Sequence, residues 1–123
     1  MRVSRHNSLP GFVDPVWVWV PSIAPSGMAF YPDTNSSAVT NLMPPDAMFP
    51  EWQGHLLVGS LKFRRLYLVE IGDDNQPVAE RVILDGEIGR IRDVAVGPGG
   101  AFGGEVFLLS DEVQGGLWRL KAR

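Results

Sequence analysis

The chain of 123 residues contains no cysteine. This absence excludes disulfide bridges, thiolate metal ligands and a cysteine nucleophile. No stretch approaches the roughly 18 apolar residues that a membrane-spanning helix needs. The N-terminal segment MRVSRHNSLPGFVDP carries positive charges but lacks the apolar run of a signal peptide behind them. The sequence therefore predicts no membrane span and shows no export signal.

An excess of positive charge is also missing. The chain has 11 Lys and Arg residues against 14 Asp and Glu residues, which gives a formal net charge of -3. Binding to a phosphate backbone depends on a basic surface. We therefore expect no nucleic-acid partner, and the cations that are present must act locally.

A helical repeat of apolar residues is absent as well. Apolar residues occur instead in short runs that 14 glycines and 10 prolines separate. Strands are predicted at residues 15–20, 27–31, 55–60, 65–71, 78–84, 92–96, 106–110 and 117–120. The turn GDDNQP joins the strands at 65–71 and 78–84 as a hairpin. Residues 32–48 are rich in turn formers and are predicted to form a surface loop. Short strands about ten residues apart are typical of all-β sandwiches, barrels and propellers.

An internal repeat narrows this choice. Two parts of the chain share one order: a short inner strand, a glycine-rich turn, an apolar strand that ends in serine (Ser60 or Ser110), a loop and an outer strand. The period of a few tens of residues is typical of propeller blades, which have roughly 40 to 50 residues. The sequence predicts an irregular lead-in at residues 1–14 and, at residues 15–123, an all-β partial propeller of about two four-stranded antiparallel blades.

Four motifs carry a family resemblance. In chain order they are PSIAPSGMAFY, FPEWQGHLLVGSLKFRRLYLVEI, GRIRDVAVGPGG and VFLLSDEVQGGLWRL. Together they resemble the C-terminal part of the glucose/sorbosone dehydrogenase family, whose members are soluble aldose sugar dehydrogenases with six-bladed β-propellers. The resemblance extends from about Pro15 to the C-terminus. It implies pyrroloquinoline quinone (PQQ) and calcium as cofactors, an aldose as substrate and a periplasmic or secreted location for the full-length family.

The resemblance also implies which residues bind PQQ. They are Lys62 of the Ser-Leu-Lys motif and both arginines of the Arg-x-Arg-Asp motif, Arg90 and Arg92. The tryptophan that lines the family's cofactor pocket matches Trp19, with Trp17 as the alternative. PQQ carries three carboxylates and an ortho-quinone, which suit guanidinium forks and a lysine ammonium. Arg90 and Arg92 are two residues apart in an extended stretch, so their side chains should point to the same side.

Each of these assignments has a structural alternative. Spacing alone favours exposed strand charges that serve solubility or salt bridges for the three cations, and core packing for the two tryptophans. No cofactor role in the family supports Arg64 or Arg65, and both are predicted to face water. Trp52 and Trp118 are predicted to lie in the core.

No catalytic residue and no metal ligand is predicted in this chain. His6 and His55 have no second histidine or carboxylate at ligand spacing. In the family, the catalytic base and the calcium ligands lie in the portion upstream of the matched motifs. We therefore expect a C-terminal fragment of a PQQ-dependent enzyme that oxidises aldoses at the anomeric carbon to lactones, and that is inactive alone. The alternative is a non-catalytic β-module that self-associates, or pairs with missing blades, through open blade edges.

Overall fold

The structure is a computed structural model that describes residues 10–11, 15–32, 49–97 and 104–121. Within these residues the chain forms seven strands and one turn of 3₁₀ helix. The elements are β1 (Pro25–Phe30), η2 (Pro50–Trp52), β2 (Leu56–Ser60), β3 (Arg65–Ile71), β4 (Pro77–Asp85), β5 (Ile91–Val96), β6 (Val106–Ser110) and β7 (Gly116–Leu120). No helix in these ranges is long and apolar enough to cross a membrane.

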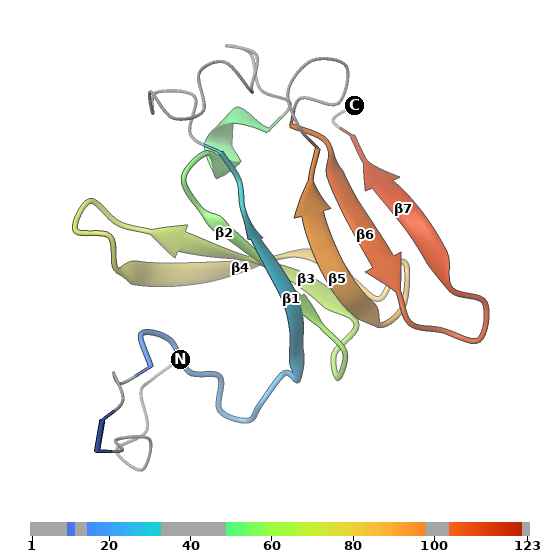
Figure 1. Cartoon of the computed structure of the whole chain (residues 1–123), viewed down its shortest axis with the longest axis horizontal. Helices are drawn as coiled ribbons and strands as arrows, with labels where there is room; N and C mark the ends of the chain where they lie inside the picture. The colour runs from blue at the N-terminus through green and yellow to red at the C-terminus, as the bar shows by residue number, and fades with distance from the viewer. Residues whose placement is uncertain (1–9, 12–14, 33–48, 98–103, 122–123) are drawn as a thin grey trace.

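The strands form two antiparallel sheets (Figure 1). The first has the order β1-β2-β3-β4 and the second the order β5-β6-β7. β1, β2 and β3 therefore correspond to β5, β6 and β7, and the two serines of the repeat end the middle strands at Ser60 and Ser110. This arrangement confirms the predicted all-β partial propeller. In the described part of the chain the second sheet has three strands instead of the four expected for a blade.

The hairpin between β3 and β4 is confirmed. Its turn is closed by hydrogen bonds from the Gly72 amide to the Gln76 carbonyl, at 2.8 Å, and from the Asn75 amide to the Gly72 carbonyl, at 3.0 Å. Asn75 has a φ of 62°, a left-handed conformation that asparagine adopts more readily than most residues. The turn sequence thus fixes how β3 and β4 pair.

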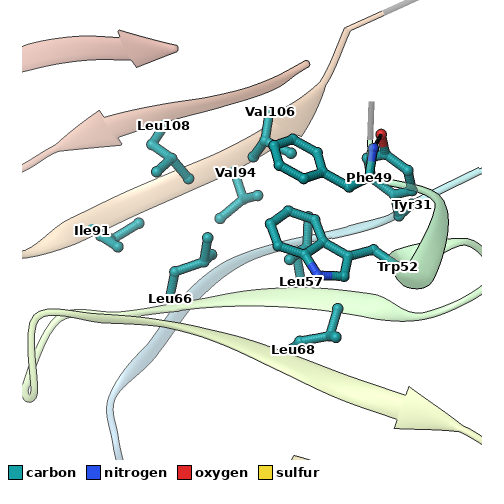
Figure 2. Packing of buried hydrophobic residues seen from close by; sticks show 10 residues of the cluster. All are labelled: Tyr31, Phe49, Trp52, Leu57, Leu66, Leu68, Ile91, Val94, Val106 and Leu108. Atoms are coloured by element: carbon teal, nitrogen blue, oxygen red, sulfur yellow. Dashed lines mark hydrogen bonds between the residues drawn. The ribbon is translucent and has the colours of Figure 1, made fainter. Parts of the chain in front are cut away.

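The main core lies between the two sheets (Figure 2). The first sheet contributes leucines and the second contributes β-branched residues and a leucine, while three aromatic rings close one end; the members are Leu57, Leu66, Leu68, Ile91, Val94, Val106, Leu108, Tyr31, Phe49 and Trp52. Burying each side chain of this kind contributes roughly 1.5–3 kcal/mol. The apolar faces of β2, β3, β5 and β6 therefore hold the sheets against each other.

The inner strands β1 and β5 approach each other closely where the sheets meet. The hydroxyl of Ser26 donates a short hydrogen bond to the Ile91 carbonyl. A Cβ atom at Gly27 would lie 2.9 Å from the Cα of Asp93, and one at Gly59 would lie 2.6 Å from the Cγ2 of Ile91. Glycine is required at both positions because backbone and side chains of β5 occupy the space.

The predicted strand at residues 15–20 is wrong. The segment forms no strand and instead lies against the first sheet: the Trp17 indole donates a hydrogen bond to Glu80 of β4, at 3.1 Å, and the Trp19 ring lies 6.3 Å from that of Tyr67 in β3. Pro15 and Pro21 lack the backbone donors that a strand would need at both ends. The alternating Trp and Val pattern therefore reflects packing of indole rings on a sheet, without strand pairing.

Of the two tryptophans that were predicted to lie in the core, one is buried and the other is not. Trp52 is buried as predicted, with 6% of its surface exposed, but Trp118 is 46% exposed and is not a core residue. Trp118 lies on β7, the outermost strand of its sheet within the described residues, so no strand covers it. The predicted loop at residues 32–48 and the glycine-rich turn after β5 lie almost wholly outside the described residues.

Candidate functional site

Both sheets present their predicted cations at the same end. β1 begins opposite the end of β2, where Pro25 pairs with Ser60, and β5 begins opposite the end of β6, where Ile91 pairs with Ser110. The contact between Ser26 and Ile91 brings these two strand ends together, at the lower end of β1 and β5 in Figure 1. The segment after β2 carries Lys62, and the start of β5 carries the two arginines.

Ser60 organises the turn that carries Lys62. Its side chain is fully buried; the hydroxyl donates a hydrogen bond to the Ile23 carbonyl at 2.6 Å and accepts one from the Phe63 amide at 3.0 Å. The Lys62 amide donates to the same Ile23 carbonyl, at 3.2 Å. The Lys62 side chain is exposed, and its ammonium lies 5.4 Å from the centre of the Phe63 ring. A buried serine therefore holds the backbone so that the lysine projects into solvent.

Arg90 and Arg92 converge on a single carboxylate. The Nη2 atom of Arg92 lies 2.7 Å from the Oδ2 atom of Asp111, and the Nη2 atom of Arg90 lies 3.6 Å from the same oxygen. The two arginines thus lie on one side of the chain, as residues two apart in an extended segment should. Both side chains are about half exposed, at 45% and 60%, whereas that of Asp111 is 32% exposed. Much of both guanidinium groups therefore remains accessible to a ligand.

Glu112 connects these arginines to the Lys62 loop. Its Oε1 atom accepts a hydrogen bond from the Arg90 amide at 2.9 Å and lies 3.9 Å from the Nε atom of Arg64. The Gly86 amide donates to the Arg64 carbonyl at 2.9 Å. Arg64 is exposed, as predicted, but it also helps to join the two sheets. Neither Asp111 nor Glu112 was identified from the sequence, although their place directly after the repeat serine Ser110 was a usable signal.

Arg65 is committed to contacts within its own sheet. It donates hydrogen bonds to the Tyr67 hydroxyl and to the Asp85 carboxylate, each at 3.1 Å. Both hydrogen bonds raise the pKa of the Arg65 guanidinium, and the bond to Tyr67 has the larger effect. The guanidinium therefore stays charged. The prediction that Arg65 simply faces water is therefore incomplete, because its side chain is partly covered and paired.

Trp19 lies on the opposite face of the first sheet from the main core. Its ring packs on Tyr67 in a second cluster with Ile23 and Val58, and its indole N–H is buried without a hydrogen-bond partner. The hydrogen bond from the Lys62 amide to the Ile23 carbonyl connects this cluster to the loop that carries Lys62. Arg90 and Arg92 thus lie close together, and Lys62 lies on the adjacent loop. Trp19 packs in the cluster to which that loop is hydrogen-bonded.

In the part of the chain that the structure describes, the histidine and acidic side chains form no metal-binding cluster. The Nδ1 atom of His55 accepts a hydrogen bond from the Ile71 amide at 3.0 Å, which is a structural role, and His6 lies outside the described residues. Across residues 10–11, 15–32, 49–97 and 104–121, no three His, Asp or Glu side chains gather as metal ligands would.

The free donors of Arg90 and Arg92 at this end of the sheets suit an anionic ligand. Lys62 and Arg64 are exposed cations on adjoining segments, which also carry the carboxylates of Asp93, Asp111 and Glu112. Paired guanidinium groups bind carboxylates through parallel hydrogen bonds, and a nearby ammonium adds a point charge. These residues therefore fit the carboxylates of PQQ.

Comparison with known proteins identifies relatives along almost the whole chain. The family model described as Glucose / Sorbosone dehydrogenase matches residues 1–119. The aldose sugar dehydrogenase YliI of Escherichia coli is 35% identical over 121 residues, which are 98% of this chain and 28% of that protein. An uncharacterized protein of Synechocystis sp. is 34% identical over 120 residues, which are 98% of this chain and 24% of that protein. The chain therefore spans about a quarter of the length of these relatives.

Solved structures give the same assignment. A glucose dehydrogenase crystal structure matches with a TM-score of 0.71 and 31% identity, over 94% of this chain and 28% of the other. The apo-form of the soluble aldose sugar dehydrogenase of Escherichia coli matches with a TM-score of 0.70 and 33% identity, over 94% of this chain and 28% of the other. Sequence and fold thus agree, and the chain belongs to the glucose/sorbosone dehydrogenase family.

Proposed function

We propose that this chain forms part of a PQQ-dependent aldose dehydrogenase and supplies one wall of its cofactor site. The observation that carries the proposal is the convergence of Arg90 and Arg92 on one carboxylate oxygen, next to the loop that holds Lys62. The names of two relatives, an aldose sugar dehydrogenase and a glucose dehydrogenase, support the substrate class.

Each of these residues would have a distinct role. Arg90 and Arg92 would bind carboxylates of the cofactor through the guanidinium donors that Asp111 leaves free, and Lys62 would add a charge from the neighbouring loop. When bound, PQQ supplies a quinone that accepts a hydride from the anomeric carbon of the aldose, which leaves the sugar as a lactone. The residues of this chain hold that group in place.

We also propose that the chain alone does not oxidise sugars. A general base must lie within hydrogen-bond reach of the sugar hydroxyl whose proton it takes. His55 is engaged with the Ile71 amide inside the first sheet. We propose that the base and the calcium ligands are supplied by a part of the enzyme that corresponds to the remaining three quarters of the relatives.

A titration of the purified chain with PQQ, followed by the quinone absorbance, tests the cofactor proposal. We expect saturable binding that Lys62→Ala and Arg92→Ala each weaken several-fold, since each removes a charge-assisted contact. Arg81→Ala is the matched control, because Arg81 is an exposed cation paired with Glu70 on the first sheet, away from the site. With glucose, calcium and a redox dye we expect no turnover.

Each of three results would contradict part of the proposal. A titration without saturation would show that the cations do not form a PQQ site. Equal binding by all three variants would show that binding does not involve Lys62 or Arg92. Dye reduction above a protein-free blank would refute the expected lack of activity.

The exposed edge of β7 supports a second candidate function, self-association. β3 is covered by β4, whereas β7, its counterpart in the repeat, is the last strand of its sheet in the described residues. Leu117 and Trp118 on this strand are 71% and 46% exposed. Such an edge can accept a strand from another chain. A solution mass that is a multiple of 13.5 kDa would support this candidate.

A further inference from the structure

The carboxylate that joins the two arginines comes from Asp111, a residue to which none of the sequence motifs assigned a role. It directly follows β6, and its amide donates a hydrogen bond to the Arg90 carbonyl at 2.7 Å. Its side chain then reaches the guanidinium groups of both arginines. Asp111 therefore contacts Arg90 through its backbone and both arginines through its side chain.

We propose that Asp111 is a positioning residue, which holds Arg90 and Arg92 side by side so that their free donors can bind one polycarboxylate ligand. The proposal rests on the proposed function for the identity of that ligand, PQQ. Two like charges on neighbouring side chains repel each other, and a shared carboxylate offsets that repulsion. Without Asp111, the two long side chains would separate and sample many rotamers.

The turn that carries Asp111 is itself fixed. The hydroxyl of Ser110 accepts hydrogen bonds from the Gly116 amide at 3.0 Å and from the Trp118 indole at 3.1 Å. Glu112, the next residue, is held by the Arg90 amide. Because the side chains on both sides of Asp111 and its own amide are hydrogen-bonded, its carboxylate has a defined position relative to the start of β5.

Asp111 leaves most of the binding capacity of both arginines unused. Each guanidinium has five N–H donors, and the contact to Asp111 engages the Nη2 atom of each arginine. Two arginines and one aspartate also retain a net positive charge. The arrangement therefore suits a positioning role better than that of an internal anion that blocks the site.

NMR of the arginine Nε–Hε groups tests the positioning itself. In the wild-type chain we expect distinct, well-ordered signals for Arg90 and Arg92; in Asp111→Asn both should move toward the values of free arginine. Asp85→Asn is the matched control, since it removes an exposed aspartate from Arg65 and should change only the Arg65 signal. If the Arg90 and Arg92 signals are the same in Asp111→Asn as in the wild type, the proposal fails.

Binding measurements test the consequence. PQQ and trimesate, a redox-inert planar tricarboxylate, should each bind Asp111→Asn about threefold more weakly, a modest effect because partly exposed ion pairs contribute little. In an Arg92→Ala background the same change should have a smaller effect, since Asp111 acts through the arginines. Asp111→Glu should recover part of the affinity. Tighter binding by Asp111→Asn would overturn the proposal, because it would identify Asp111 as a competitor.

The two proposals fail in different ways. If the wild-type chain binds neither PQQ nor trimesate, the proposed function is wrong, and the NMR comparison still decides whether Asp111 holds the arginines. If PQQ binds and Asp111→Asn binds it equally well at an unchanged melting temperature, the cofactor site stands and the role of Asp111 is refuted.

Discussion

Replacing Gly27 with alanine should loosen the junction of the two sheets. Gly27 lies in β1, and a Cβ atom there would be 2.9 Å from the Cα of Asp93 and 3.2 Å from the Val94 amide nitrogen. Carbon atoms pack best about 3.5–4.0 Å apart. The nearest atom, Oδ1 of Asp93 at 2.5 Å, belongs to a side chain that can rotate away, but these two are backbone atoms of β5. Side-chain rotation therefore cannot relieve the whole clash, and the strands themselves must move apart.

The expected cost follows from two opposing terms. Overpacking a well-filled site typically costs about 1–3 kcal/mol. Alanine also restricts the unfolded chain more than glycine does, which offsets roughly 0.4–1 kcal/mol of that cost. We therefore expect Gly27→Ala to lower the free energy of unfolding by about 1–2 kcal/mol, which corresponds to several degrees in melting temperature for a domain of this size.

Urea and thermal unfolding followed by circular dichroism measure this effect, with Gly115→Ala as the control. Gly115 lies in the turn before β7, and the nearest atom to an added Cβ is the Ser110 carbonyl oxygen at 3.4 Å, an ordinary contact. The control should therefore be neutral or slightly stabilising. Equal midpoints for the two variants would refute the inferred close approach of β1 and β5.

Two further predictions concern the buried tyrosine and the exposed edge. The Tyr31 hydroxyl donates to the Gly104 carbonyl and accepts from the Phe49 amide, so Tyr31→Phe should cost about 1–3 kcal/mol at pH 7. Burial raises the pKa of Tyr31 above that of the unfolded chain, about 10, so this tyrosine's contribution to stability is full below pH 10 and declines above it. Wild type should lose stability there faster than Tyr31→Phe, and parallel urea midpoints from pH 8 to 11 would contradict this. If the chain self-associates through β7, Leu117→Lys should reduce its mass in sedimentation to that of a monomer, because a charge replaces an exposed apolar contact on that strand; an unchanged multimer would exclude this edge.

The sequence predicted the fold well where strand patterns and turn residues agree. β3 and β4 are joined by a turn whose asparagine takes the left-handed conformation, and both middle strands end in a serine whose hydroxyl accepts a hydrogen bond from an amide a few residues later. Such signals lie within a few residues of each other. The segment at residues 15–20 misled because alternation of Trp and Val is equally compatible with side chains that pack on a sheet from outside.

The candidate site was predictable only in part. Arg90 and Arg92 were identified through a motif, and their common side follows from extended geometry. Asp111 could not be chosen in the same way, because its contact with Arg92 depends on the pairing of β5 with β6, about twenty residues apart in sequence. Trp118 was misjudged for a related reason, since whether another strand covers it depends on sheet order.

The two repeats diverge at two equivalent positions, and that divergence places different charges at the proposed site. After Ser60 the chain continues with Leu61 and Lys62, whereas after Ser110 it continues with Asp111 and Glu112. The first repeat thus supplies an exposed cation, and the second supplies carboxylates that contact Arg90 and Arg92. These groups can act on one ligand only if the sheets meet closely, as the glycines facing β5 allow. Loosening that junction should therefore weaken anion binding as well as stability.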